Sequence, residues 1–218
     1  MFKQKKAIIF DLDGTLVDSM HVWDKVDADF LAKRGHAVPD DLFTNLPSGD
    51  GLLPIAHYFK ERFSLIEDVD AILAEWESML IDFYSEVRLI NGAYETLNKL
   101  LSLNKILGMG TSNSEVLAEA VLTNNKIKNY FSSIVTGCKV ERGKPFPDIY
   151  LTVAKELGVK PDECLVIEDT THGVEAAKNA GMSVIAIYND YSKRDEEALK
   201  QKADRFVRDY NELDSLLF

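Results

Sequence analysis

The chain contains little of what several protein classes require. It has two cysteines, Cys138 and Cys164, which are too few for a disulfide scaffold and do not form a C-x-x-C pair. No apolar run approaches the roughly 20 residues that a membrane-spanning helix needs. The apolar stretch behind the basic N-terminus, residues 7–10, is too short for the core of a signal peptide. We therefore expect a cytoplasmic protein without a membrane partner.

Positive charge is also scarce. The 25 lysines and arginines are outnumbered by 36 acidic residues, which gives a formal net charge of −11. This balance disfavours nucleic acid as a partner, although a small phosphate can still bind where positive groups are concentrated. The hydrophobic fraction of 46% and the charged fraction of 28% are those of an ordinary globular protein, and no feature of the 218 residues demands more than a monomer.

The hydrophobic pattern changes along the chain. From about residue 19 to residue 86 it predicts helices alone, over 19–34, 51–63 and 67–87. The apolar face of the third helix consists of Val69, Ile72, Leu73, Trp76, Leu80, Phe83 and Tyr84. From residue 90 onward, predicted helices (93–103, 114–123, 148–157, 173–180 and a terminal one) alternate with predicted strands (106–109, 133–135, 164–167, 182–187 and 205–207). The alternation indicates an α/β protein with a Rossmann-like, doubly wound parallel sheet.

The helical block interrupts this sheet in sequence. The first predicted strand, 7–10, belongs to the sheet but is separated from its other strands by the block. The block is therefore an insertion after the first strand. We expect a Rossmann-like core formed by residues 1–15 and 88–218, and an inserted α-helical cap domain, 16–87, over the active crevice.

Two carboxylates, Asp11 and Asp13, stand where the first strand ends. Side chains two apart on a strand point the same way, and ligands of open α/β sheets bind at the carboxyl ends of the strands. An EF-hand is excluded, because Leu16 and Val22 occupy the positions that require Gly and Glu. An Asp-rich turn without a function is an alternative at this point. The functional interpretation is a Mg²⁺ site that leaves one carboxylate as a nucleophile and the other as an acid or base.

A second acidic pair, Glu168 and Asp169, follows the predicted strand 164–167. Acids at a helix N-terminus are favoured by the helix dipole alone, without any further function. Two separate strands that each end in acids favour another interpretation. In this functional interpretation, Glu168 and Asp169 lie beside Asp11 at one edge of the sheet and bind a metal ion with it.

Thr111, Ser112 and Asn113 stand between a predicted strand and a predicted helix. Hydroxyl groups and helix N-terminal amides together form phosphate sites. Alternatively, Ser112, Asn113 or Ser114 is a helix N-cap, which is the interpretation that this stretch favours by itself. A dinucleotide-binding loop is excluded, because Asn113 occupies the position of the third glycine.

Lys144 lies in the loop 143–148, between a glycine and two prolines that restrict the backbone. A solvated surface position is the usual place of a lysine. The rigid setting favours instead a cation that steadies phosphate charge. The loop is not a P-loop, because Pro145 replaces the required Ser or Thr.

Taken in order, these motifs resemble those of the haloacid dehalogenase-like superfamily of phosphotransferases. The matches are D-x-D-G-T at 11–15, T-S-N at 111–113, G-K-P-x-P-D at 143–148 and E-D-T-x-x-G at 168–173. The resemblance implies that Asp11 is a nucleophile that forms an aspartyl-phosphate, and that Asp13 is the acid and base. It also implies phosphate contacts from Thr111, Ser112, Asn113 and Lys144, and Mg²⁺ ligands from Asp11, the backbone carbonyl of Asp13, Asp169 and Glu168, the last directly or as support.

The helical insertion is similar to the cap of the subfamily that contains β-phosphoglucomutases and sugar phosphatases. Asp18-Ser19 followed by Trp23-Asp24 resembles the D-S-x-x-x-W-D pattern of hexitol- and deoxyhexose-phosphate phosphatases. The arginine of the mutase G-x-S-R motif is missing from the comparable loop, 47–51, and the presence of Asp13 argues against a dehalogenase. The candidate substrate contacts are His21, Trp23, the loop 45–51 and His57, each of which has an alternative as cap core or surface.

We therefore predict a Mg²⁺-dependent phosphatase that acts on small phosphorylated metabolites, such as sugar or polyol phosphates, through an aspartyl-phosphate. The alternative enzyme is a β-phosphoglucomutase-type phosphomutase. The alternative from another class is a catalytically silent binding or regulatory module, which the four intact motifs disfavour.

Overall fold

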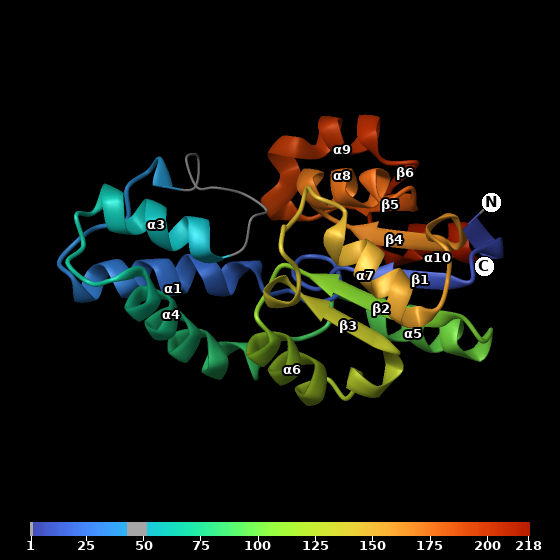
Figure 1. Cartoon of the computed structure of the whole chain (residues 1–218), viewed down its shortest axis with the longest axis horizontal. Helices are drawn as coiled ribbons and strands as arrows, with labels where there is room; N and C mark the ends of the chain where they lie inside the picture. Colours follow the sequence, from blue (N-terminus) through green and yellow to red (C-terminus); the bar gives the residue numbers. More distant parts are fainter. Residues whose placement is uncertain (1, 43–51) are drawn as a thin grey trace.

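The computed structural model describes residues 2–42 and 52–218 of the chain. At its centre lies a six-stranded parallel sheet in the order β3-β2-β1-β4-β5-β6 (Figure 1). The strands are β1 (Ala7–Phe10), β2 (Ile106–Thr111), β3 (Ser133–Thr136), β4 (Cys164–Glu168), β5 (Ser183–Ile187) and β6 (Arg205–Val207). Each expected strand is present, and the predicted parallel sheet is confirmed.

The strand order changes direction beside β1. The chain passes from β1 to β2 and β3 on one side, and then returns to β4, β5 and β6 on the other. Phe10, the last residue of β1, pairs with Met109 of β2 and with Ile167 of β4, so the three central strands end within two residues of one another. In open α/β sheets, such a switch point forms a crevice outside the carboxyl ends of the strands. The residues that follow β1 and β4 are thereby brought together.

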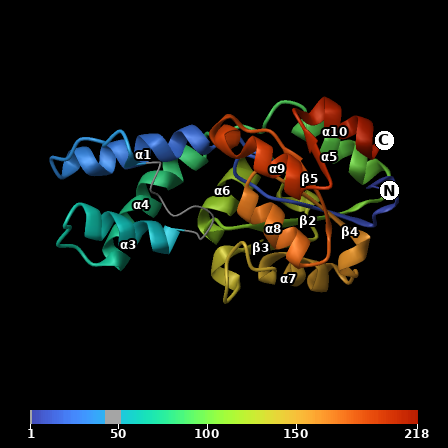
Figure 2. The same cartoon turned by 90° about the horizontal axis from the view of Figure 1, so that it is seen from above.

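Helices cover both faces of the sheet (Figure 2). One face packs against α7 (Asp148–Leu157), α8 (Thr171–Asn179) and α9 (Glu196–Lys202), and the other against α5 (Ala93–Ser102), α6 (Glu115–Asn124) and α10 (Tyr210–Leu217). Successive strand side chains point to opposite faces, so Ile9 packs with the first group and Ile8 and Phe10 with the second. Burial on both faces explains the unbroken apolar run of β1 and confirms the doubly wound fold.

Three further helices form a block beside the carboxyl edge of the sheet: α1 (Met20–Lys33), α3 (Leu52–Arg62) and α4 (Val69–Tyr84) (Figure 1). The centre of the block is aromatic, because the Trp76 ring lies 5.3 Å from that of Phe30 and 5.0 Å from that of Phe59. Tilted and edge-on ring pairs of this kind add to the stability that burial provides. Helix α4 also packs against α6 of the sheet region. The predicted loop 45–51 lies outside the described residues.

The two segments that join the block to the sheet pair with each other. Val17 forms an antiparallel bridge with Leu89. The amide of Asp18 donates to the carbonyl of Arg88 at 3.0 Å, and the amide of Ile90 donates to the carbonyl of Leu16 at 2.9 Å. We call these paired segments, 16–18 and 88–90, the connecting ladder.

Two helices differ most from the sequence prediction. Helix α9 was not expected, because Leu199 is the one buried residue among its seven and its charged residues give no clear apolar period. Helix α4 ends at Tyr84, three residues early, and begins at Val69, where the Asp68 carboxylate caps it by accepting from the amide of Ala71.

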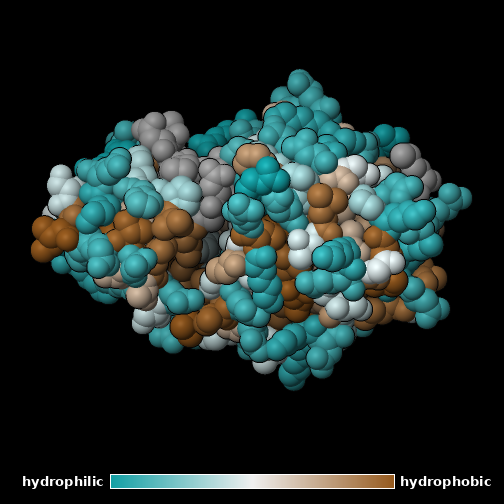
Figure 3. All heavy atoms as spheres, in the orientation of Figure 1, coloured by the Kyte–Doolittle hydropathy of each residue, from teal (hydrophilic) through white to brown (hydrophobic). Residues whose placement is uncertain are grey.

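Surface polarity varies from place to place over the molecule. In the view of Figure 3, hydrophilic side chains dominate the surface over α9, whereas hydrophobic side chains gather over parts of the helical block. Among the described helices, none combines the length and the apolar composition that a bilayer crossing requires.

Candidate active site

Three buried carboxylates meet at the carboxyl edge of the sheet. Asp11 follows β1, Glu168 is the last residue of β4, and Asp169 comes directly after it. One carboxylate oxygen of each residue lies within 4.8 Å of those of the other two. The structure thus joins residues from both acidic pairs in one set of hard oxygen donors, the kind of ligand that Mg²⁺ and Ca²⁺ prefer.

Lys144 is the positive charge among these acids. Its ammonium group donates to Asp11 Oδ1 at 2.6 Å and to Glu168 Oε1 at 2.7 Å, and only 3% of its side chain is exposed. Burial by itself would lower the pKa of Lys144, but the two carboxylates raise that pKa well above its ordinary value. Lys144 is therefore a buried cation of the site and not a solvated surface lysine.

Glu168 is surrounded by hydrogen-bond donors. Besides Lys144, its carboxylate accepts from the amide and the hydroxyl of Thr170, at 2.6 and 3.0 Å, and from the hydroxyl of Tyr150 at 3.3 Å. A Cβ at Gly173 would lie 1.6 Å from Glu168 Oε1, so the last glycine of the E-D-T-x-x-G motif makes room for this carboxylate. Sequence reasoning missed Thr170, which lies inside that motif, and Tyr150, which looks like an ordinary residue of an amphipathic helix.

Asp169 has fewer partners. The Thr15 hydroxyl donates to its Oδ1 at 3.0 Å, and Gly14, at a φ of +78°, passes so close that a Cβ there would lie 2.3 Å from its Oδ2. Burial, with the neighbouring carboxylates, raises the pKa of Asp169 well above its ordinary range. Burial also raises the pKa of Asp11 to about 8, although Lys144 opposes this. The three carboxylates share a single buried ammonium group, that of Lys144, and a divalent cation fits this set of oxygen donors.

The Asp13 side chain is held apart from this cluster. Its Oδ1 accepts from the hydroxyls of Ser19 and Tyr84, both at 2.6 Å, and its Oδ2 accepts from Asn113 Nδ2 at 2.9 Å. Burial and the Asp13 carboxylate raise the pKa of Tyr84 well above its ordinary value, so its hydroxyl stays protonated as a donor. Ser19 directly precedes α1 without a capping hydrogen bond from its side chain, and Tyr84 ends α4, so the helical block reaches the site here.

Thr111, Ser112 and Asn113 lie at the carboxyl end of β2, beside β1. Thr111 is buried, and its hydroxyl accepts from the amide of Asn113 at 3.1 Å. The N-cap of α6 is Ser114, whose hydroxyl accepts from the amide of Leu117 at 3.4 Å. The N-cap interpretation therefore applies to Ser114 and not to the three residues before it.

The predicted substrate contacts differ in their positions. Trp23 is partly buried, and its ring meets that of Tyr84 edge-on at 6.0 Å, which places it near Asp13. His21 is exposed in the first turn of α1, and His57 is exposed on α3. Trp23 is thus the better placed of the three.

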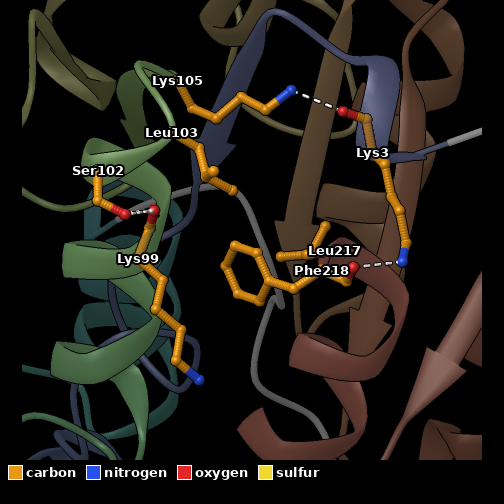
Figure 4. A pocket seen from close by; sticks show the side chains of 7 residues that line it. All are labelled: Lys3, Lys99, Ser102, Leu103, Lys105, Leu217 and Phe218. Carbon is orange, nitrogen blue, oxygen red and sulfur yellow. Dashed lines mark hydrogen bonds between the residues drawn. The ribbon is translucent and has the colours of Figure 1, made fainter.

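An open pocket near the two chain ends lies on the opposite edge of the sheet (Figure 4). It is lined by Lys3, Lys99, Ser102, Leu103, Lys105, Leu217 and Phe218. The ammonium of Lys3 donates to the carbonyl of Phe218, and that of Lys105 donates to the carbonyl of Lys3 at 2.7 Å. Lys99 pairs with Asp214. These cations hold the terminal segments together, and the acidic edge remains the candidate active site.

The switch point of this Rossmann-like sheet, where ligands bind in such folds, holds buried acids and a buried lysine, the kind of charged groups that stabilise phosphoryl transfer. Residues 8–187 match the family model for haloacid dehalogenase-like hydrolases, and the chain belongs to this family. The predicted family and fold are thereby confirmed.

Several relatives of this chain are named as phosphatases. It is 30% identical over 211 residues to the validoxylamine A 7'-phosphate phosphatase of Streptomyces hygroscopicus subsp. limoneus, with 95% of each chain covered. It is 28% identical over 195 residues to hexitol phosphatase B of Escherichia coli (strain K12), which covers 85% of this chain and 84% of the relative. CbbY from Rhodobacter sphaeroides, solved in complex with phosphate, shares the fold with a TM-score of 0.86 over 96% of each chain at 24% identity. The family and these relatives support a phosphatase.

Proposed function

We propose that the protein is a Mg²⁺-dependent phosphatase of small phosphorylated metabolites, of the sugar or polyol phosphate class. The observation that carries the proposal is the buried contact of Lys144 with Asp11 and Glu168, next to Asp169. It sets a carboxylate nucleophile beside the positive charge that phosphoryl transfer requires. The relatives named for hexitol phosphates and for validoxylamine A 7'-phosphate support the substrate class.

In the proposed reaction, an oxygen of Asp11 attacks the phosphorus of the substrate. The bond between phosphorus and the substrate oxygen breaks, Asp13 gives a proton to the departing alcohol, and an aspartyl-phosphate is formed on Asp11. Asp13 then takes a proton from a water molecule whose oxygen attacks the phosphorus. The bond to Asp11 breaks, and inorganic phosphate leaves.

The remaining residues would bind the phosphoryl group and the metal ion. Thr111, Ser112, Asn113 and Lys144 would contact the phosphoryl oxygens. Mg²⁺ would be held by Asp11, Asp169 and the backbone carbonyl of Asp13, with Glu168 as a direct ligand or as support. The bound metal neutralises charge on the transferred group.

We also assign substrate choice to residues 16–87 as a cap, and the reaction to residues 1–15 and 88–218. The sequence 43–51 contains neither lysine nor arginine, so it supplies no cation for the second phosphate of a sugar bisphosphate. This favours hydrolysis over the phosphomutase reaction.

The test is phosphate release from a panel of sugar, polyol and nucleotide phosphates. We expect hydrolysis of sugar or polyol phosphates that a chelator abolishes and Mg²⁺ restores. A panel without any hydrolysis contradicts the proposal. Interconversion of hexose phosphates that needs a bisphosphate activator, without net phosphate release, supports the mutase instead.

A further inference from the structure

Tyr84 belongs to a closed ring of hydrogen bonds with Asp13 and Asn113. Its hydroxyl donates to Asp13 Oδ1 at 2.6 Å and accepts from Asn113 Nδ2 at 3.0 Å. Asn113 completes the ring by donating to Asp13 Oδ2 at 2.9 Å. Tyr84 is 0% exposed, so this hydroxyl works inside the candidate site and not at the surface.

The ring is fixed from both parts of the molecule. The side-chain oxygen of Asn113 accepts from the amide of Ser114 at 2.8 Å, which turns its nitrogen toward Asp13 and Tyr84. On the other side, Tyr84 is the last residue of α4, just before the connecting ladder. Ser19, which donates to the same Asp13 oxygen, stands just after the first segment of that ladder. The hydroxyls of Ser19 and Tyr84, on either side of the connecting ladder, therefore both donate to Asp13 Oδ1.

We propose that Tyr84 is a positioning residue that, together with Ser19, aims the Asp13 carboxylate from the helical block toward the leaving oxygen of the substrate. The inference rests on the proposed function, because that function gives Asp13 the proton transfer. A general acid acts only within hydrogen-bond reach of the oxygen that it protonates, so its orientation limits the rate. Tyr84→Phe keeps the ring that packs on Trp23 but leaves an Asn113 hydrogen without its acceptor and Asp13 Oδ1 with one donor fewer.

The experiment compares two leaving groups in Tyr84→Phe. Sorbitol 6-phosphate, or the alkyl phosphate that the wild type hydrolyses fastest, releases an alcohol that needs a proton. The p-nitrophenyl ester releases a phenolate that leaves without one. We expect kcat/KM for the alkyl phosphate to fall by about ten-fold or more, and kcat/KM for the aryl phosphate to fall by less than about three-fold. A general loss of structure reduces both values alike.

Tyr130→Phe is the matched control, because the hydroxyl of Tyr130 contacts Tyr94 and Asn98, which are not part of the candidate site. Both kcat/KM values should stay at the wild-type level in this variant. If Tyr84→Phe does not fold, Ser19→Ala removes the other hydroxyl from the same oxygen and should show the same leaving-group pattern. Equal losses on both substrates, or no loss on either, overturn the inference while the phosphatase stands. A wild type without activity overturns the proposed function and this inference with it.

Discussion

Buried acidic groups at the carboxyl edge of the sheet have hydrogen-bond partners, whereas a buried acidic group of the helical block has none among the described residues. At the edge, Asp11 is hydrogen bonded to Lys144 and Asp169 to Thr15. In the block, Asp27 on α1 is 7% exposed, and within residues 2–42 and 52–218 no hydrogen bond or ion pair reaches its carboxylate. Burial, reinforced by nearby Asp24, raises the pKa of Asp27 to about 7.

The two regions are therefore stabilised by different kinds of interaction. The edge joins its buried charges into one network whose geometry leaves little freedom, as phosphoryl transfer requires. The block is held by rings and aliphatic side chains around Phe30, Phe59 and Trp76, and the Trp76 indole N–H is also without a partner among the described residues. Apolar packing tolerates substitution better than a buried network does, which agrees with the proposed role of the block in substrate choice.

The largest effect is expected at Asp11. Asp11→Asn removes the proposed nucleophile, so kcat should fall by about 10³-fold or more, as for other essential catalytic groups. Phosphate release on the best substrate of the panel measures this. Asp162→Asn, an exposed change outside the four motifs, is the control and should keep its activity. Full activity of Asp11→Asn would show that the edge does not carry the chemistry in the way proposed.

Lys144→Met should damage both activity and stability. It leaves two carboxylates buried without their cation, a change that typically costs about 3–5 kcal/mol of unfolding free energy. We expect kcat/KM to fall by about 100-fold or more as well, because charge stabilisation of the phosphoryl group is lost. Urea unfolding and phosphate release measure the two effects. Lys139→Met, which removes an exposed pairing with Glu115, is the control and should change neither activity nor stability. If Lys144→Met also leaves both unchanged, the role of the buried network is contradicted.

Asp27→Asn should stabilise the protein, and only at neutral or higher pH. The pKa of Asp27 is raised from 3.8 in the unfolded chain to about 7 in the fold, so the folded state binds more protons in this window. The contribution of Asp27 to stability therefore falls as the pH rises from about 4 to about 7, by at most on the order of 4 kcal/mol.

Thermal unfolding at pH 5 and pH 8 tests this sign. The gain in Tm of Asp27→Asn over the wild type should be larger at pH 8 than at pH 5. Asp29→Asn, an exposed change on the same helix, should give no such difference. A loss of stability in Asp27→Asn at pH 8 would mean that its carboxylate is stabilised in the fold after all.

The smallest effect is expected at Trp23. Trp23→Leu removes part of an aromatic wall near Asp13, and we expect KM for the alkyl phosphate to rise by about three- to ten-fold with little change in kcat. His57→Gln, on an exposed face of α3, should leave KM within about two-fold of the wild type. A fall in kcat without a change in KM for Trp23→Leu would place this residue with the reaction and not with substrate choice.

The sheet and its acidic edge could be predicted because their signals are local. Asp11 and Glu168 each end an apolar run, and parallel strands bring such ends together without further information. Lys144 could be singled out from the glycine and prolines around it. Its exact contacts could not, because they depend on how the loop folds back over β1 and β4.

The contribution of the helical block could not be predicted in the same way. Tyr84 falls on the apolar period of its helix, so its ring appears as core and its hydroxyl gives no signal. Ser19 resembles a helix cap, yet its hydroxyl is directed to Asp13 and not to the helix. Helix α9 has a single buried residue, Leu199, and contacts made with α8 and β6 decide its structure.

The covalent intermediate on Asp11 tests the central claim most directly. Wild-type protein with Mg²⁺ and the best substrate is quenched during turnover with borohydride, which reduces an acyl phosphate to an alcohol, and the peptides are analysed by mass spectrometry. We expect homoserine at position 11 in the wild type and no such product in Asp11→Asn. Steady phosphate release with an unmodified Asp11, or trapping at another carboxylate, would contradict it.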